Sequence, residues 1–154
     1  MSFQIPNKVQ IIGQDIQPDQ LKYHDKVVQV SKEFTFDSAH HLHCYEGKCK
    51  NLHGHTYKLQ IMSGKVDERG LTIDFTDMKR ITKERIVDRL DHRYLNEVLP
   101  LMNTTAENMV VWIYEQLQQA LQEEGWLPRI QIDELRLWET PTSYAGVTRQ
   151  MMEA

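Results

Sequence analysis

Apolar and polar residues alternate with a period of two near both ends of the chain, a pattern typical of half-buried strands. The alternation predicts four strands, at residues 26–36, 53–62, 129–139 and 143–149. Within the third strand the register of alternation changes near residues 133–134, which indicates a bulge.

Between these two pairs of strands, the apolar residues recur at helical spacing. A first helix is expected from residues 76–77 to about Leu90. A second helix follows a sequence typical of a capping box, with Thr104 as the cap and Glu107 three positions later, and it ends at Gly125. The order strand, strand, helix, helix, strand, strand predicts an α+β fold with an antiparallel sheet.

A chain of 154 residues fits one domain, which we expect to span residues 26–154. Residues 1–25 are polar and contain Pro6 and Pro18, so they are expected to form a loose N-terminal arm. The arm lacks the apolar region of a signal peptide, and no apolar run approaches the roughly 20 residues of a membrane span. These features favour a soluble cytoplasmic protein.

The formal net charge of −4 and the pI near 6.0 argue against nucleic acid as a partner. The chain has only two cysteines, Cys44 and Cys49, which is too few for a secreted disulfide scaffold. In a cytoplasmic protein both would be reduced and free for metal binding or catalysis.

Five of the seven histidines lie within residues 40–55. Side chains two positions apart on a strand point to one face, so His53 and His55 can converge on a single ion. His40 follows the preceding strand and can face this pair, because antiparallel neighbours lie about 5 Å apart. Three imidazoles leave the fourth position of a zinc ion open, as in catalytic sites. The alternative is a pair of ordinary surface histidines.

Further metal-capable residues lie beside this set, at His41, His43 and Cys44. A structural zinc site would be expected to close with Cys44 or Cys49. Cys49 precedes His53 by four residues, and near zinc its thiolate could act as a base or nucleophile. A small buried hydrophobe and a fourth zinc ligand remain alternatives for Cys49.

Two carboxylates are candidates for catalysis or binding. Asp91 adjoins His92, and a carboxylate beside an imidazole can fix its tautomer and raise its basicity. A histidine favoured by the dipole at a helix end is the alternative. Glu139 ends a predicted strand and could accept two parallel hydrogen bonds from the N–H edge of a pterin or guanine, unless it is a solvated surface residue.

Six short motifs stand in a characteristic order: FDSAH at 36–40, CKNLHGH at 49–55, IDF at 73–75, LDH at 90–92, NTTAE at 103–107 and ET at 139–140. Over about residues 26–149 the chain resembles the 6-pyruvoyl-tetrahydropterin synthase superfamily. The three-residue gap between Cys49 and His53 is similar to that of the 6-carboxytetrahydropterin synthase branch, which serves queuosine biosynthesis. Mammalian-type biopterin enzymes space this cysteine further from the His-Gly-His motif.

The resemblance implies a tunnelling fold (T-fold), in which two hairpins form a four-stranded antiparallel sheet with two helices on one face. It also implies self-association: trimers close their sheets into a barrel, and two trimers stack into a homohexamer with active sites between subunits. The implied substrate is 7,8-dihydroneopterin triphosphate, the implied cofactor Zn²⁺, and no redox cofactor is required.

The resemblance assigns roles to nine residues: zinc ligation to His40, His53 and His55; catalysis to Cys49 as general base with Asp91 and His92 as a proton relay; and substrate binding to Glu139, Thr105 and Glu107. The implied products are 6-carboxytetrahydropterin, acetaldehyde and triphosphate. Three alternatives remain open: a synthase that makes 6-pyruvoyl-tetrahydropterin, a non-catalytic oligomer that binds zinc or pterin, and a structural zinc module.

Overall fold

The computed structural model describes residues 16–154, apart from the side chains at positions 62 and 63. The arm expected over residues 1–25 therefore lies largely outside the described residues. Its described part contains a single 3-10 turn, Pro18–Gln20, whose residues are all exposed.

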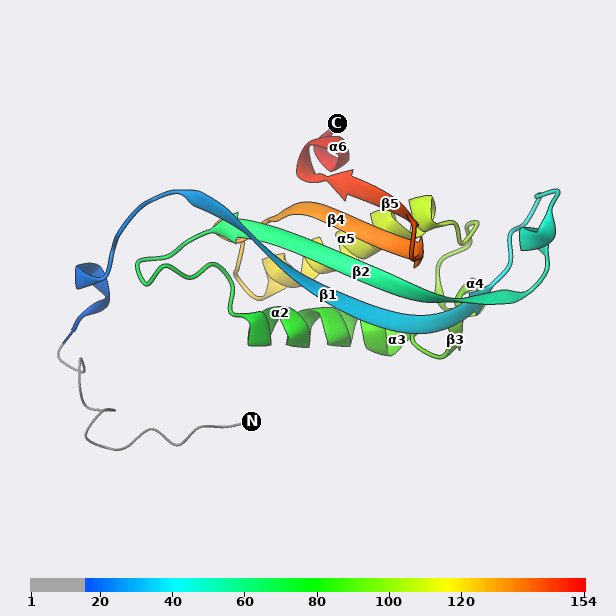
Figure 1. The fold of residues 1–154 in the computed structure, drawn as a ribbon, viewed down its shortest axis with the longest axis horizontal. Helices are drawn as coiled ribbons and strands as arrows, with labels where there is room; N and C mark the ends of the chain where they lie inside the picture. Colours follow the sequence, from blue (N-terminus) through cyan, green and yellow to red (C-terminus); the bar gives the residue numbers. More distant parts are fainter. Residues whose placement is uncertain (1–15) are drawn as a thin grey trace.

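One twisted sheet organises the molecule, with the strand order β3-β1-β2-β4-β5 (Figure 1). The strands are β1 (Val27–His40), β2 (His53–Lys65), β3 (Arg93–Tyr94), β4 (Ile132–Thr140) and β5 (Ser143–Thr148). The pairs β1–β2, β2–β4 and β4–β5 are antiparallel, which confirms the predicted hairpins. The four predicted strands are all present, and β3 is an additional fifth strand that pairs in parallel with β1. Two residues are too few to produce a pattern of alternation.

The first strand extends to His40, four residues beyond its predicted end. The last part of this strand contains polar residues: Ser38 and His40 are buried, and Asp37 is exposed. The pattern of apolar residues therefore could not show that the strand continues to His40. The predicted bulge in β4 is confirmed: Met62 pairs with Glu134 and Ser63 pairs with Ile132, which leaves Asp133 as the extra residue.

The helices are α2 (Phe75–Thr82), α3 (Asp88–Leu90), α4 (Leu95–Val98), α5 (Ala106–Glu123) and α6 (Arg149–Glu153). A π-helical turn joins α2 to α3, so the helix predicted to end near Leu90 is confirmed as one continuous segment. Its cap is Asp74, whose carboxylate accepts from the N–H of Thr76. The predicted cap at Thr104 was wrong by one residue, because the side chain of Thr105 accepts from the N–H of Asn108.

The hydrophobic core lies between the helices and one face of the sheet. Alternate strand residues such as Phe36, Leu59 and Leu137 pack there against Met109 and Ile113 of α5, all at most 2% exposed. Each large side chain buried in this way contributes roughly 1.5–3 kcal/mol. The same alternation places His40, His53 and His55 on the helix-covered face and the residues between them on the other face, called here the open face.

The hairpin of β1 and β2 runs along the molecule, and its connecting loop lies at the end opposite the described N-terminal segment (Figure 1). In the part of the chain that the structure describes, no helix is long and apolar enough to cross a bilayer.

Candidate metal centre and active site

The register of the β1–β2 hairpin brings three histidines together where the helix-covered face meets the connecting loop. His40 pairs directly with His53, and His55 pairs with Ser38 one step further from the loop. All three imidazoles leave the strands on the same face. His40 is 1% exposed, so this group is partly withdrawn from water.

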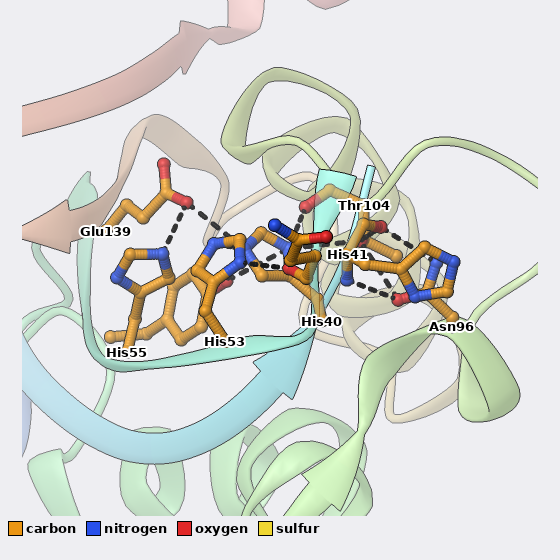
Figure 2. A network of polar contacts seen from close by, with 9 residues as sticks. His40, His41, His53, His55, Asn96, Thr104 and Glu139 are labelled. Carbon is orange, nitrogen blue, oxygen red and sulfur yellow. Dashed lines mark hydrogen bonds and ion pairs between the residues drawn. The ribbon is translucent and has the colours of Figure 1, made fainter. Parts of the chain in front are cut away.

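The donor atoms of these histidines converge. The Nε2 atoms of His40 and His53 lie 3.0 Å apart, and the ring centroids of His53 and His55 lie 4.9 Å apart. Glu139 at the end of β4 completes the group, with its Oε1 3.3 Å from His40 Nε2 and 3.0 Å from His55 Nε2 (Figure 2). One donor atom from each residue lies within 4.8 Å of all the others, as a shared metal ion requires.

Neighbouring carbonyl groups fix the tautomers of two of these rings. His40 Nδ1 donates to the carbonyl of Thr104 over 2.7 Å, and His53 Nδ1 donates to the carbonyl of Asn51 over 2.7 Å. In the neutral imidazoles the Nε2 atoms therefore carry lone pairs, and these face one another across 3.0 Å. A cation between them relieves that repulsion, so the donor set fits a metal.

His55 adds a further sign of a missing partner. Its Nε2 is buried and has no hydrogen-bond partner. The carboxylate of Glu139 lies 3.0 Å away, but this contact is not a hydrogen bond. Burial lowers the pKa of His55, with the nearby histidines acting in the same direction and Glu139 against it. The neutral, metal-binding form of this imidazole is therefore favoured.

Glu139 is not the solvated surface residue that the sequence left open. The contact with His40 lowers the pKa of Glu139, partial burial acts against it, and His55 and His53 act in the same direction as His40. Tyr57 lies beneath the group, and burial raises the pKa of its phenol, with a smaller contribution from Glu139. The centre thus contains one carboxylate, three imidazoles and a neutral phenol.

A second layer of polar groups holds the chain beyond His40. The side-chain amide of Asn96 contacts the main chain of His41 at both its N–H and its carbonyl, each over 3.0 Å. His41 Nδ1 is hydrogen-bonded to the hydroxyl of Tyr94 over 2.6 Å, so this ring is directed away from His40 (Figure 2). Neither His41 nor His43 belongs to the donor group around His40.

The predicted pairing of Asp91 with His92 is present. His92 has φ +55°, and its Nδ1 lies 3.0 Å from the Asp91 carboxylate. The main-chain N–H of Asp37 also donates to Asp91 over 2.9 Å, and this bond, with the contact to His92, lowers the pKa of Asp91. The Asp37 side chain lies on the open face, where Thr56 donates to it. Asp91 and His92 form a group with Asp37 and do not belong to the donor group of the three histidines.

The remaining predicted residues lie in chain segments that adjoin residues of the centre. Cys49 is half-buried in the 3-10 turn Lys48–Lys50. Its thiol is not part of the described donor group, which argues against Cys49 as a fourth metal ligand. Thr105 caps α5, and Glu107 is exposed in the first turn of that helix. Both follow Thr104, whose carbonyl contacts His40.

Sequence reasoning missed the supporting residues. Thr104 is fully buried and contacts His40 through both its carbonyl and its hydroxyl, yet it was interpreted only as a helix cap. The sequence indicates Asp37 only as part of the FDSAH motif. In the structure its main-chain N–H donates to Asp91 and its carboxylate accepts from Thr56. The alternation in β1 is the signal that could have placed Asp37 on the face opposite His40.

Comparisons with known proteins identify the family of the chain. The family model described as 6-pyruvoyl tetrahydropterin synthase matches residues 29–150. The 6-carboxy-5,6,7,8-tetrahydropterin synthase of Haemophilus influenzae is 40% identical over 141 residues, covering 75% of this chain and 95% of that protein. The protein of the same name from Synechocystis is 36% identical over 97 residues, covering 59% of this chain and 75% of that protein.

Among solved structures, the 6-pyruvoyl tetrahydropterin synthase of Caenorhabditis elegans superposes with a TM-score of 0.70 at 22% sequence identity. The match covers 82% of this chain and 98% of that one, which confirms the expected T-fold. With a family model that spans most of its length and relatives of 36–40% identity, the chain belongs to the 6-pyruvoyl tetrahydropterin synthase family.

Proposed function

We propose that this protein is a zinc-dependent 6-carboxy-5,6,7,8-tetrahydropterin synthase of queuosine biosynthesis. Its substrate would be 7,8-dihydroneopterin triphosphate, and its products 6-carboxytetrahydropterin, acetaldehyde and triphosphate. The observation that carries the proposal is the convergence of the Nε2 atoms of His40, His53 and His55 beside Glu139. The names of the relatives and the short gap between Cys49 and His53 support this choice of product.

The zinc ion would be held by His40, His53 and His55. Their chemistry fits, because two of the rings already have Nδ1 engaged by carbonyl groups and the third has a buried nitrogen that makes no hydrogen bond. When bound, zinc would supply a Lewis acid for the hydroxyl oxygens of the substrate side chain. Three protein ligands would leave a position for substrate, which is the pattern of a catalytic site.

Glu139 would anchor the pterin ring. Its lowered pKa keeps the carboxylate ionised, and an ionised carboxylate can accept two parallel hydrogen bonds from the N–H edge of the ring. The carboxylate also lies near the histidines, so the ring would be bound beside the metal. Thr105 and Glu107 would line the same pocket from the start of α5.

Proton transfer would be divided between Cys49 and the Asp91–His92 pair. Asp91 accepts from the Asp37 main chain and lies against His92, so it can hold the imidazole in one orientation while His92 takes up or releases a proton. Because this pair does not belong to the donor group of the three histidines, we infer that it serves the site of a neighbouring subunit. That inference accords with a homohexamer whose sheets close into barrels.

A product assay tests the proposal. Zinc-loaded protein is incubated with 7,8-dihydroneopterin triphosphate, the pterin is identified by mass, and acetaldehyde is measured in parallel. A 6-carboxy pterin with acetaldehyde is the expected result. A 6-pyruvoyl product without acetaldehyde would assign the chain to the alternative reaction, and absence of turnover with zinc bound would favour a binding function.

Cys49→Ala separates an enzyme from a binding protein. As general base, Cys49 is expected to be required for turnover but not for zinc, since its thiol lies outside the donor group. Full activity in this variant would contradict the role of Cys49, whereas loss of zinc would make the thiol a ligand.

A further inference from the structure

A cavity of about 460 Å³ opens where β2 and β4 separate. Pairing between these strands begins at Lys58 and Trp138, and in the described structure no β4 residue pairs with the part of β2 that precedes Lys58. Beyond Trp138, β4 continues to Thr140 and turns into β5. The sheet is therefore open beside the histidine group.

The cavity joins the two faces of the sheet. His55 and Glu139 of the histidine group line it from the helix-covered side. Lys58 also lines it, but strand alternation places this side chain on the open face. A ligand held at the histidines can therefore extend through the gap to Lys58 without crossing a paired part of the sheet.

The ammonium group of Lys58 is held in place by its neighbours, and its charge is only weakly neutralised by a carboxylate. Its Nζ lies 4.6 Å from the centroid of the Trp138 ring, a cation–π contact that restrains the ammonium group. The carboxylate of Glu33 is 4.0 Å away, at the limit of an ion pair, and its side chain is 56% exposed. Arg136, the next cation on the open face, differs because Glu134 binds it over 2.7 Å. Among the residues that line this cavity, Lys58 is the only lysine or arginine.

We propose that the Lys58 ammonium group binds the polyphosphate tail of the substrate in this cavity. The proposal rests on the proposed function, which places the hydroxyl groups of a short side chain at the histidines and a triphosphate at the end of that chain. The negative charge of Glu139 repels phosphate, and the ammonium group at the far end of the same cavity attracts it. Lysine commonly binds phosphate as a point charge, with charge-assisted hydrogen bonds.

Calorimetric titration with inorganic tripolyphosphate tests the site directly. The zinc-loaded wild type is compared with Lys58→Met, with Lys58→Arg and with Lys65→Met as a matched control on the same strand, and zinc content is measured after each titration. Lys58→Met should weaken tripolyphosphate binding about 10- to 100-fold, as expected for loss of a charge-assisted hydrogen bond. Lys58→Arg should restore most of the affinity, and Lys65→Met should match the wild type.

Neopterin without phosphate should bind Lys58→Met as tightly as it binds the wild type, which separates a phosphate contact from damage to the pocket. Arg93 lines a second hollow, together with His55 and His92, and provides a rival cation. Tripolyphosphate affinity that is lost in Arg93→Met but unchanged in Lys58→Met would overturn the proposal, as would a wild type that does not bind tripolyphosphate.

The binding assay does not depend on turnover. If the wild type binds tripolyphosphate through Lys58 but makes no 6-carboxy pterin, the anion site stands and the proposed function fails. If the wild type makes the product and Lys58→Met shows unchanged tripolyphosphate affinity and unchanged KM, the anion site fails alone.

Discussion

His40 and His53 face each other across the β1–β2 ladder with their Nε2 atoms 3.0 Å apart, while each donates its Nδ1–H to a main-chain carbonyl. The ladder fixes their separation, and the carbonyls of Thr104 and Asn51 fix the ring orientations. The two nitrogens are therefore directed at a common point before any ion binds. Such preorganisation is what the outer shell of a metal site supplies.

His53→Ala should lose zinc and keep its fold. The variant removes one of three ligands, so zinc affinity should fall by more than the roughly 10- to 100-fold that loss of an outer-shell partner costs. Circular dichroism should remain that of the wild type, because the buried core does not include His53. His41→Ala is the matched control and should retain zinc, since that ring hydrogen-bonds to Tyr94. Unfolding on removal of zinc by a chelator would instead indicate a structural site.

Glu139→Gln distinguishes a pterin anchor from a fourth metal ligand. An amide keeps the size of the side chain but presents an N–H in place of an acceptor, so the pterin N–H edge would lose a bond. We expect zinc content to be unchanged and KM to rise about 10- to 100-fold, the cost of one charge-assisted hydrogen bond. A large loss of zinc with little change in KM would make Glu139 a ligand instead. Zinc by elemental analysis and steady-state kinetics give the two readouts.

A mixture of Cys49→Ala and His92→Ala oligomers should be more active than either variant alone. If one subunit supplies Cys49 and its neighbour supplies His92, random reassembly leaves about a quarter of the sites with both residues intact. The two proteins are dissociated together, reassembled and assayed, with each variant treated alone as the control. Activity that stays at the level of the separate variants would mean that both residues serve the site of their own chain.

Zinc affinity should be nearly constant above pH 7 and should begin to fall only at a pH below 6.5. Burial lowers the pKa of His55 from its ordinary value of 6.5, so the ring is neutral at pH 7 and zinc displaces no proton from it. Below 6.5 the unfolded chain binds more protons at this residue than the folded chain does, so the metal-free protein should also lose stability. Competition with a chelator of known pH dependence measures the affinity.

A continued rise in zinc affinity between pH 7 and pH 9 would contradict this assignment. It would indicate that zinc displaces a proton from a ligand with a higher pKa, such as a cysteine thiol, which normally titrates near pH 8.5.

Much of the fold could be predicted from the periodic spacing of apolar residues, because each hairpin and each helix buries one of its faces. The bulge at Asp133 was visible as a change in that alternation. The two-residue strand β3 was not visible, since it is held by tertiary contact with β1. The end of β1 was placed too early, because its last buried residues, Ser38 and His40, are polar.

For the candidate site, the spacing of His53 and His55 predicted their convergence, and His40 joined them through the hairpin register. Local spacing could not show that Asp91 and His92 do not belong to the donor group of these histidines, because their position depends on the main chain of Asp37. Nor could it identify the carbonyl of Thr104 as the partner of His40, since a main-chain acceptor leaves no trace in residue identity.

The central claim is an open zinc centre built by His40, His53 and His55, and zinc X-ray absorption of the purified protein tests it most directly. The account predicts three imidazole nitrogens at about 2.0–2.1 Å, a further oxygen or nitrogen atom, and no sulfur. Addition of a pterin that carries side-chain hydroxyl groups should alter the oxygen contribution and leave the imidazoles in place. A sulfur neighbour at about 2.3 Å would contradict the claim, because it would make Cys49 or Cys44 a ligand and close the site.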